Sequence, residues 1–134
     1  MDEEKNVYRL IDANFNRAAE GLRVCEDISR FILNNKELSE DFKNLRHSLF
    51  LLKKSFPYQQ LLQARDVDAD VGRETKEALK RNWQEILIAN FGRTKEALRC
   101  LEEFSQFLNP LSSKQIQEIR FKIYKIEKKV LGKI

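Results

Sequence analysis

The sequence predicts one all-α domain built from a helical hairpin that occurs twice. The chain of 134 residues suffices for one hydrophobic core, and it contains only four Gly and two Pro to interrupt helices. Residues 13–23, ANFNRAAEGLR, return as residues 89–99, ANFGRTKEALR. The match continues in the pairs Glu26/Glu102, Ser29/Ser105 and Phe31/Phe107. Apolar periodicity does not require matching Asn, Arg and Glu, so the repeat indicates a duplicated unit that kept a polar constellation.

The first copy, about residues 4–54, predicts two helices. Residues 4–33 carry apolar side chains at steps of three, four and seven, and Asn34-Asn35 should end this helix because Asn tolerates the left-handed cap position. Ser39 is the predicted N-cap of the second helix, and Pro57 should end it at Phe56. The buried stripe of the second helix is Phe42, Leu45, Leu49 and Leu52.

The second copy, about residues 75–131, predicts two more helices. One should span residues 75–108 with a bend near Gly92, and it should include Leu79 in its apolar stripe before Asn109-Pro110 ends it. Ser112 with Gln115 has the spacing of a capping box for the last helix. The two hairpins can bury their stripes only against each other, which predicts a four-helix-bundle-like domain with pseudo-twofold symmetry.

The loop at residues 64–73 breaks the helical pattern. Asp66, Asp68 and Asp70 offer carboxylate oxygens, which Mg²⁺ prefers, while Arg65 and Arg73 offer donors to phosphate. The Gly and Glu positions that a calcium-binding EF-hand needs are absent from this spacing. The alternative is a solvated acidic turn whose last Asp caps the following helix.

The repeated polar residues form one ridge in each copy. Asn14 and Arg17 lie along a helix face, and Asn90 with Arg93 reproduce the pair. A guanidinium fork beside an amide suits an anion. The small residue at Gly21 and Ala97 leaves room for a ligand or a crossing helix. The alternative is that each Arg simply pairs with the Glu three residues later on the helix surface.

Composition excludes several classes of protein. Cys25 and Cys100 lie inside helical patterns, which indicates reduced thiols. No apolar run reaches transmembrane length, and the acidic N-terminus does not resemble a signal peptide, which predicts a cytoplasmic protein. The net charge of +4 does not require nucleic acid as a partner. His47, the single histidine, cannot form a zinc site alone, and no phosphate-loop motif is present.

Several segments together resemble one family. They are Asp12-Ala13-Asn14 with Arg17, residues 20–23 with Glu26-Asp27, Arg46-His47, Ala64-Arg65-Asp66 with Asp70-Val71-Gly72, Ala89-Asn90 with Arg93, and residues 96–99 with Glu102-Glu103. This combination resembles the all-helical domain that some bacteria fuse to the N-terminus of thiamine-phosphate synthase. That family is assigned as an alternative hydroxymethylpyrimidine-phosphate kinase. The resemblance covers roughly residues 11–107.

The resemblance implies an activity and a site. The activity is phosphoryl transfer from ATP, with Mg²⁺, to 4-amino-5-hydroxymethyl-2-methylpyrimidine phosphate, which gives the diphosphate. The expected roles are catalysis for Arg65 and Asp66, metal binding for Asp66 and Asp70, and binding of substrate or phosphate for Asn14, Arg17, Arg46, His47, Asn90 and Arg93.

Two other functions stay open at this point. One is a non-catalytic N-terminal domain of thiamine-phosphate synthase that dimerises or docks onto the synthase. The other is a helical nucleic-acid or regulatory module, suggested by the lysine-rich tail alone. The sequence leaves undetermined whether the chain forms a homodimer, which copy binds ATP, how many metal ions bind, and whether the chain is a fragment of a fusion.

Overall fold

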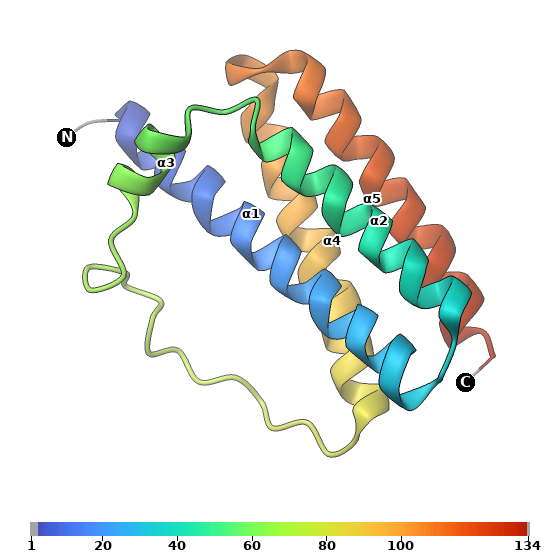
Figure 1. Cartoon of the computed structure of the whole chain (residues 1–134). Helices are drawn as coiled ribbons and strands as arrows, with labels where there is room; N and C mark the ends of the chain where they lie inside the picture. The colour runs from blue at the N-terminus through green and yellow to red at the C-terminus, as the bar shows by residue number, and fades with distance from the viewer. Residues whose placement is uncertain (1–2, 134) are drawn as a thin grey trace.

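The regular elements are all helices in the computed structural model, which describes residues 3–133 (Figure 1). They are α1 (Glu3–Asp27), a π-helical turn η1 (Ile28–Ile32), α2 (Lys36–Lys53), α3 (Tyr58–Ala64), α4 (Trp83–Leu108) and α5 (Pro110–Leu131). The all-α prediction is confirmed.

The two hairpins pack through their first helices. α1 and α4 form the most extensive helix contact and run in opposite directions, while α2 covers α1 and α5 covers α4. The hairpins α1–α2 and α4–α5 correspond to the two predicted copies. Their relation by a pseudo-twofold axis stays a prediction.

Aromatic and aliphatic side chains from both hairpins make one core. Phe15, Phe42 and Phe91 are fully buried, and the rings of Phe42 and Phe91 lie 5.8 Å apart across the junction between α2 and α4. A second contact, between Phe15 and Phe56 at 5.3 Å, joins α1 to the turn after α2. Burial of these side chains holds the hairpins together.

Small residues let α1 and α4 approach closely. A Cβ at Gly21 would overlap Thr94 Oγ1 and would lie 3.2 Å from the Asn90 carbonyl oxygen. Ala97, the counterpart of Gly21, is buried as well. The sequence analysis expected the small residue to leave room for either a ligand or a crossing helix. The structure shows a crossing helix at this position.

Three helix starts differ from the predictions, and α2 ends at Lys53, before the predicted Phe56. α4 begins at Trp83 rather than residue 75, because Asn82 accepts a hydrogen bond from the Glu85 N–H at 2.9 Å, and Leu79 before it is 95% exposed. Asn35 and Asn109, rather than Ser39 and Ser112, cap α2 and α5. Both side chains accept the N–H three residues on, and Pro110 follows Asn109 at the first helical position.

Two further features concern the connections. Asn34 has φ 50°, so the predicted left-handed end of the first helix is confirmed. The short helix α3 was not predicted, because its seven residues are too few to show periodicity. It buries Leu61 and Ala64 beside the start of α1. Residues 65–82, the connecting segment, then run as turns and extended chain to α4.

Candidate functional site

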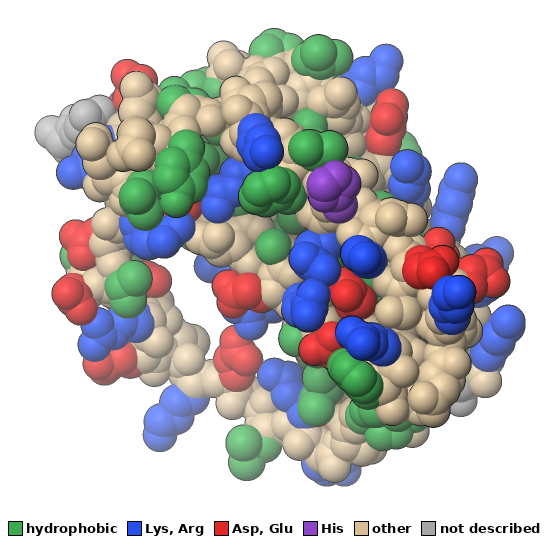
Figure 2. Space-filling model, viewed as in Figure 1, with side chains coloured by type: hydrophobic (Ala, Val, Ile, Leu, Met, Phe, Trp, Pro, Cys, Tyr) green, Lys and Arg blue, Asp and Glu red, His purple; other side chains and the backbone are tan. Residues whose placement is uncertain are grey.

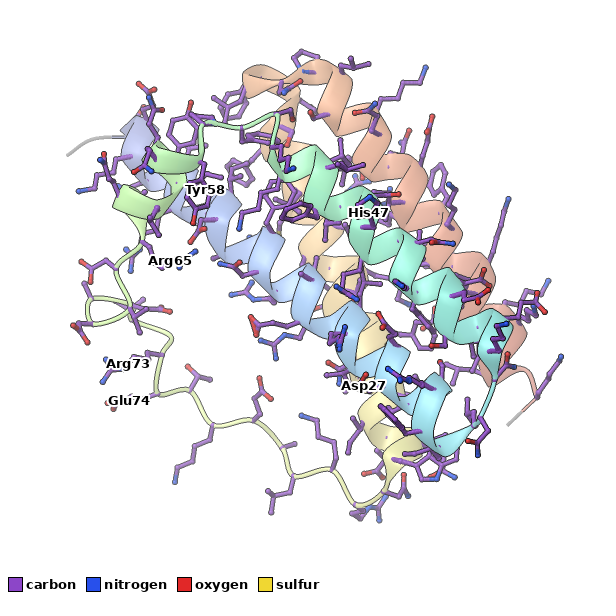
Figure 3. The ribbon with its side chains drawn as sticks, in the orientation of Figure 1. Asp27, His47, Tyr58, Arg65, Arg73 and Glu74 are labelled. Atoms are coloured by element: carbon purple, nitrogen blue, oxygen red, sulfur yellow. The ribbon has the colours of Figure 1, made fainter. Side chains whose placement is uncertain are left out.

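The predicted site residues lie in two separate regions. His47 lies on α2, whereas Arg65, Arg73 and Glu74 lie on the connecting segment on the other side of α1 (Figure 3). The structure therefore does not gather all the predicted residues in one place.

Arg65 is bound by a carboxylate of α1. It follows α3 directly, and its Nε and Nη2 donate to the two oxygens of Asp12 at 2.8 and 2.9 Å. Asp12 is buried, and the hydrogen bond from Arg65 to it, with its negative charge, raises the pKa of Arg65 above its ordinary value. The planar fork predicted to bind phosphate is thus occupied by a carboxylate. Sequence reasoning missed this role of Asp12 because the two residues lie far apart in the chain.

The acidic residues of the loop stabilise its turns. Asp66 accepts the Ala69 N–H at 3.0 Å, Asp70 accepts the Gly72 N–H at 2.9 Å, and Asp68 pairs with Arg73 at 3.0 Å. Because α4 begins only at Trp83, Asp70 does not cap it. Across residues 3–133, no group of three or more His, Cys, Asp or Glu is placed to hold a metal ion. Metal binding by Asp66 and Asp70 stays a prediction.

The two Asn residues of the ridges make the same bond. Asn14 Nδ2 donates to the Leu10 carbonyl at 2.9 Å, and Asn90 Nδ2 donates to the Ile86 carbonyl at 2.8 Å. The matching Asn therefore has a shared structural role, with each amide bound to its own helix.

The Arg residues of the ridges differ from each other. Arg17 donates to Asn14 Oδ1 at 3.2 Å, whereas Arg93 lies 3.6 Å from Glu77 of the connecting segment. The Nε of Arg93 is buried without a hydrogen-bond partner. The structure thus ties the second ridge to the connecting segment, and binding of substrate or phosphate by these residues stays a prediction.

Another repeated pair ties each hairpin together. Arg46 Nε donates to Glu26 at 3.0 Å, and in the other hairpin Arg120 Nε donates to Glu102 at 3.0 Å. Glu26 and Glu102 are buried between the helices, where an unpaired charge would be costly. These contacts explain physically why the duplicated sequence matches at polar positions.

A groove between α1 and α2 contains the predicted Arg46 and His47. It has a volume of about 640 Å³. Its apolar lining is Phe15, Ala19, Leu49 and Phe50, and its polar lining is Asn16, Lys43, Asn44, Arg46, His47 and Lys53. Figure 2 shows His47 beside hydrophobic side chains and a cluster of Lys and Arg. Such a lining suits a small anion, and the sequence reasoning had not identified Lys43 or Lys53.

Asp12 lies between this groove and the connecting segment. Lys53 Nζ is 4.0 Å from Asp12 Oδ1 and donates to Asn16 Oδ1 at 3.3 Å. Arg9 donates to the Asp66 carbonyl at 2.9 Å, which fixes the start of the segment to α1.

None of the helices described here is both long and apolar enough to cross a bilayer.

The chain is similar to one family and to several curated proteins. The sequence model of the ThiD2 family matches residues 9–129 of this chain. A thiamine-phosphate synthase of Synechocystis sp. is 40% identical over 131 residues, which cover 94% of this chain and 36% of the relative. One from Nostoc punctiforme is 39% identical over 129 residues, with 94% and 36% covered, and one from Rhodopirellula baltica is 38% identical over 125 residues, with 91% and 33% covered. No solved structure matches this chain.

These comparisons correct the predicted activity. The relatives carry the name of a synthase, so the prediction of a hydroxymethylpyrimidine-phosphate kinase is wrong. The expectation that the chain binds ATP and Mg²⁺ came from the same resemblance. The names of the relatives do not test that expectation. The chain spans about a third of the length of the curated relatives it matches.

Proposed function

Because this chain belongs to the ThiD2 family, we propose that it serves thiamine biosynthesis as a non-catalytic helical domain that docks onto the catalytic unit of a thiamine-phosphate synthase. One observation carries the proposal: nearly the whole chain matches about a third of each of several synthases. In those relatives the matching segment is part of a longer chain named as a synthase, and sharing a polypeptide would give the two parts a high effective concentration for each other.

An apolar surface at one end of the bundle offers the contact. Leu51, Phe107 and Leu111 are 51, 66 and 69% exposed, and we call them the end patch. Ser55 Oγ lies 2.9 Å from Ser112 Oγ, which brings the end of α2 against the start of α5. Figure 2 shows hydrophobic side chains at this end, at the top of the view. Contiguous exposed apolar patches are typical of interaction sites, which is why we assign the contact to this end.

The proposed binding partner of the end patch is the catalytic unit of the synthase. A protein interface typically buries about 1,200–2,000 Å², with apolar anchors near its centre. The end patch would supply those anchors. Replacing two of them should weaken the complex strongly, because a few anchor residues carry most of the binding energy.

The test mixes this chain with the catalytic part of a related synthase that lacks its helical third. Isothermal titration calorimetry should detect a complex. The double variant Phe107→Ser/Leu111→Ser should bind about tenfold or more weakly, since each lost anchor costs about 1–2 kcal/mol. Ile88→Ser is the matched control, because Ile88 is also exposed but lies away from the α2–α5 end.

Three outcomes would contradict the proposal. They are the absence of a complex, equal binding by the double variant, and a homodimer in analytical ultracentrifugation that uses the same patch. The last outcome would assign the end patch to a second copy of this chain instead.

A further inference from the structure

The connecting segment, residues 65–82, carries the chain from the first hairpin to the second. Every residue of the segment is exposed, and Figure 1 shows it running outside the bundle from α3 to the start of α4. The space-filling view shows open space between part of the segment and the helices (Figure 2). Among residues 3–133, the hydrophobic core takes no side chain from this segment. The segment therefore links the two hairpins without being packed between them.

The first part of the segment is tied to α1. Arg65 donates to the two oxygens of Asp12 at 2.8 and 2.9 Å. Arg9 of α1 donates to the Asp66 carbonyl at 2.9 Å, and turns then continue to residue 74. The bonds that anchor this part to the bundle therefore run to the first hairpin.

The last part of the segment is tied to α4. Glu77 lies 3.6 Å from Arg93 Nη1. Arg81 donates to the Glu85 carboxylate through Nε and Nη2, at 3.0 and 2.8 Å. None of the contacts given for the two parts crosses position 76. The segment is thus divided at Lys76 into two parts, each held by its own hairpin.

Lys76 lies where the segment is least restrained. Residues 75–81 form neither helix nor turn, and among residues 3–133 the Lys76 side chain has no hydrogen-bond or ion-pair partner. The other basic residues of the segment are all held by carboxylates: Arg65 by Asp12, Arg73 by Asp68, Lys80 by Glu77 and Arg81 by Glu85.

From this arrangement we propose that the peptide bond between Lys76 and Glu77 is a cleavage site for proteases that cut after basic residues, and that the two hairpins stay assembled after the cut. Exposed backbone without internal hydrogen bonds is the preferred site of such cleavage, whereas helical backbone must first open locally. The reaction consumes one water molecule. The C–N bond breaks, the hydroxyl goes to the Lys76 carbonyl carbon, and the hydrogen goes to the Glu77 nitrogen.

The contacts that hold the hairpins together do not involve the segment. α1 and α4 form the most extensive helix contact, and the rings of Phe42 and Phe91 lie 5.8 Å apart between the hairpins. Lys129 of α5 also pairs with Glu37 of α2 at 3.2 Å. Burial of the apolar faces favours association whether or not the chain is continuous. These contacts lie apart from the end patch, so the proposal does not depend on docking to a synthase.

The first test is brief digestion of the full chain with trypsin. Mass spectrometry should identify residues 1–76 and 77–134 as the first products. Lys76→Gln removes the side chain that trypsin recognises, so loss of the intact chain should slow about tenfold. Lys114→Gln is the matched control, because it removes the same charge from an exposed position within α5 and should leave the rate unchanged.

The second test examines the cleaved protein. It should elute in size-exclusion chromatography as the intact protein does and keep the helical signal in circular dichroism. Its urea midpoint should rise with protein concentration, because the two pieces now associate as separate molecules. The midpoint of the intact chain should not depend on concentration, because the link gives the hairpins an effective concentration on the order of millimolar.

Any of four results would overturn the proposal. They are a first cut at another bond, an unchanged digestion rate in Lys76→Gln, separation of the pieces or loss of helix on cleavage, and a midpoint of the cleaved protein that does not depend on concentration. The last result would show that each hairpin folds without the other.

Discussion

Asp12 and Arg65 are joined by two parallel hydrogen bonds of 2.8 and 2.9 Å, across 53 positions of sequence. Asp12 is buried on α1, and Arg65 is the first residue after α3. The pair therefore fixes both α3 and the start of the connecting segment to the first hairpin. It also uses two of the donors of an Arg that the sequence analysis expected to act on phosphate.

Replacing Asp12 should destabilise the protein. Asp12→Asn keeps the size of the side chain but removes the charge and one acceptor, so the free energy of unfolding should fall by about 1.5–3 kcal/mol. Urea unfolding followed by circular dichroism measures this loss. Asp68→Asn is the control, because the Asp68–Arg73 pair is exposed and such pairs contribute little. Equal losses in the two variants would contradict a special role for Asp12.

The two repeated ion pairs should differ in strength. The side chain of Arg120 is 11% exposed and that of Arg46 is 32% exposed, while Glu102 and Glu26 are equally buried. Arg120→Gln should therefore lower the free energy of unfolding by more than Arg46→Gln, by about 1 kcal/mol, because solvent screens the Arg46 pair better. Chemical denaturation of the two variants provides the comparison. A larger loss for Arg46→Gln would show that burial does not control these pairs.

Two glycines of the long helices should respond in opposite directions to alanine. Gly21→Ala forces a Cβ onto Thr94 and should destabilise the protein by about 1–3 kcal/mol. Gly92→Ala meets nothing within 4 Å and should stabilise it by about 1 kcal/mol through helix propensity.

A second substitution tests the cause of the loss at Gly21. Thr94→Ala removes the clashing hydroxyl and introduces the residue found at the equivalent Ala18. The double variant Gly21→Ala/Thr94→Ala should therefore recover part of the stability. If thermal melting shows no recovery, the close approach of α1 and α4 at this point is not the reason for the glycine.

The thiol of Cys25 should stay protonated while the chain is folded. Burial, with a smaller effect of the Glu127 charge, raises the pKa of Cys25 from 9.0 to about 12. Between pH 9 and 12 the unfolded state releases this proton and the folded state keeps it. The stability therefore falls as the pH rises through this window, by up to about 1.4 kcal/mol per pH unit.

Comparison with a variant isolates this effect from the lysines. Cys25→Ala should show a shallower loss of unfolding free energy above pH 9 than the unmodified chain. Mass spectrometry after brief treatment with iodoacetamide at pH 8 should find Cys25 modified only when denaturant is present. Rapid modification of the folded chain at Cys25 would contradict its burial.

Local sequence patterns predicted most of the helices. The stripe that includes Phe42, Leu45 and Leu49 has helical periodicity, and its residues are buried as expected. Asn34 and the Asn109-Pro110 pair ended helices where predicted, because cap chemistry acts within one turn. Because such patterns are local, they do not reveal which apolar residues the rest of the fold will cover, and this explains the wrong start of α4. Leu79 continued an apolar stripe in the sequence, but nothing in the fold covers it.

The interpretation of the repeat was correct in part. Matching Asn, Arg and Glu indicated that polar residues had been kept for a purpose, and the structure shows a structural purpose for Asn14, Asn90, Glu26 and Glu102. Sequence identity does not reveal whether a polar residue binds a ligand or a neighbouring helix. Only the partner's position distinguishes the two, and that position comes from the tertiary structure.

The sequence by itself determined the helical class, the duplication and the helix ends at Asn34 and Asn109, because these depend on periodicity and caps within a few residues. Tertiary structure alone decided that Asp12 binds Arg65, that Gly21 meets Thr94, and that Lys43, His47 and Lys53 line one open groove. Those contacts arise when apolar faces pack and bring distant segments together. Their energies depend on burial and distance, which no spacing along the chain specifies.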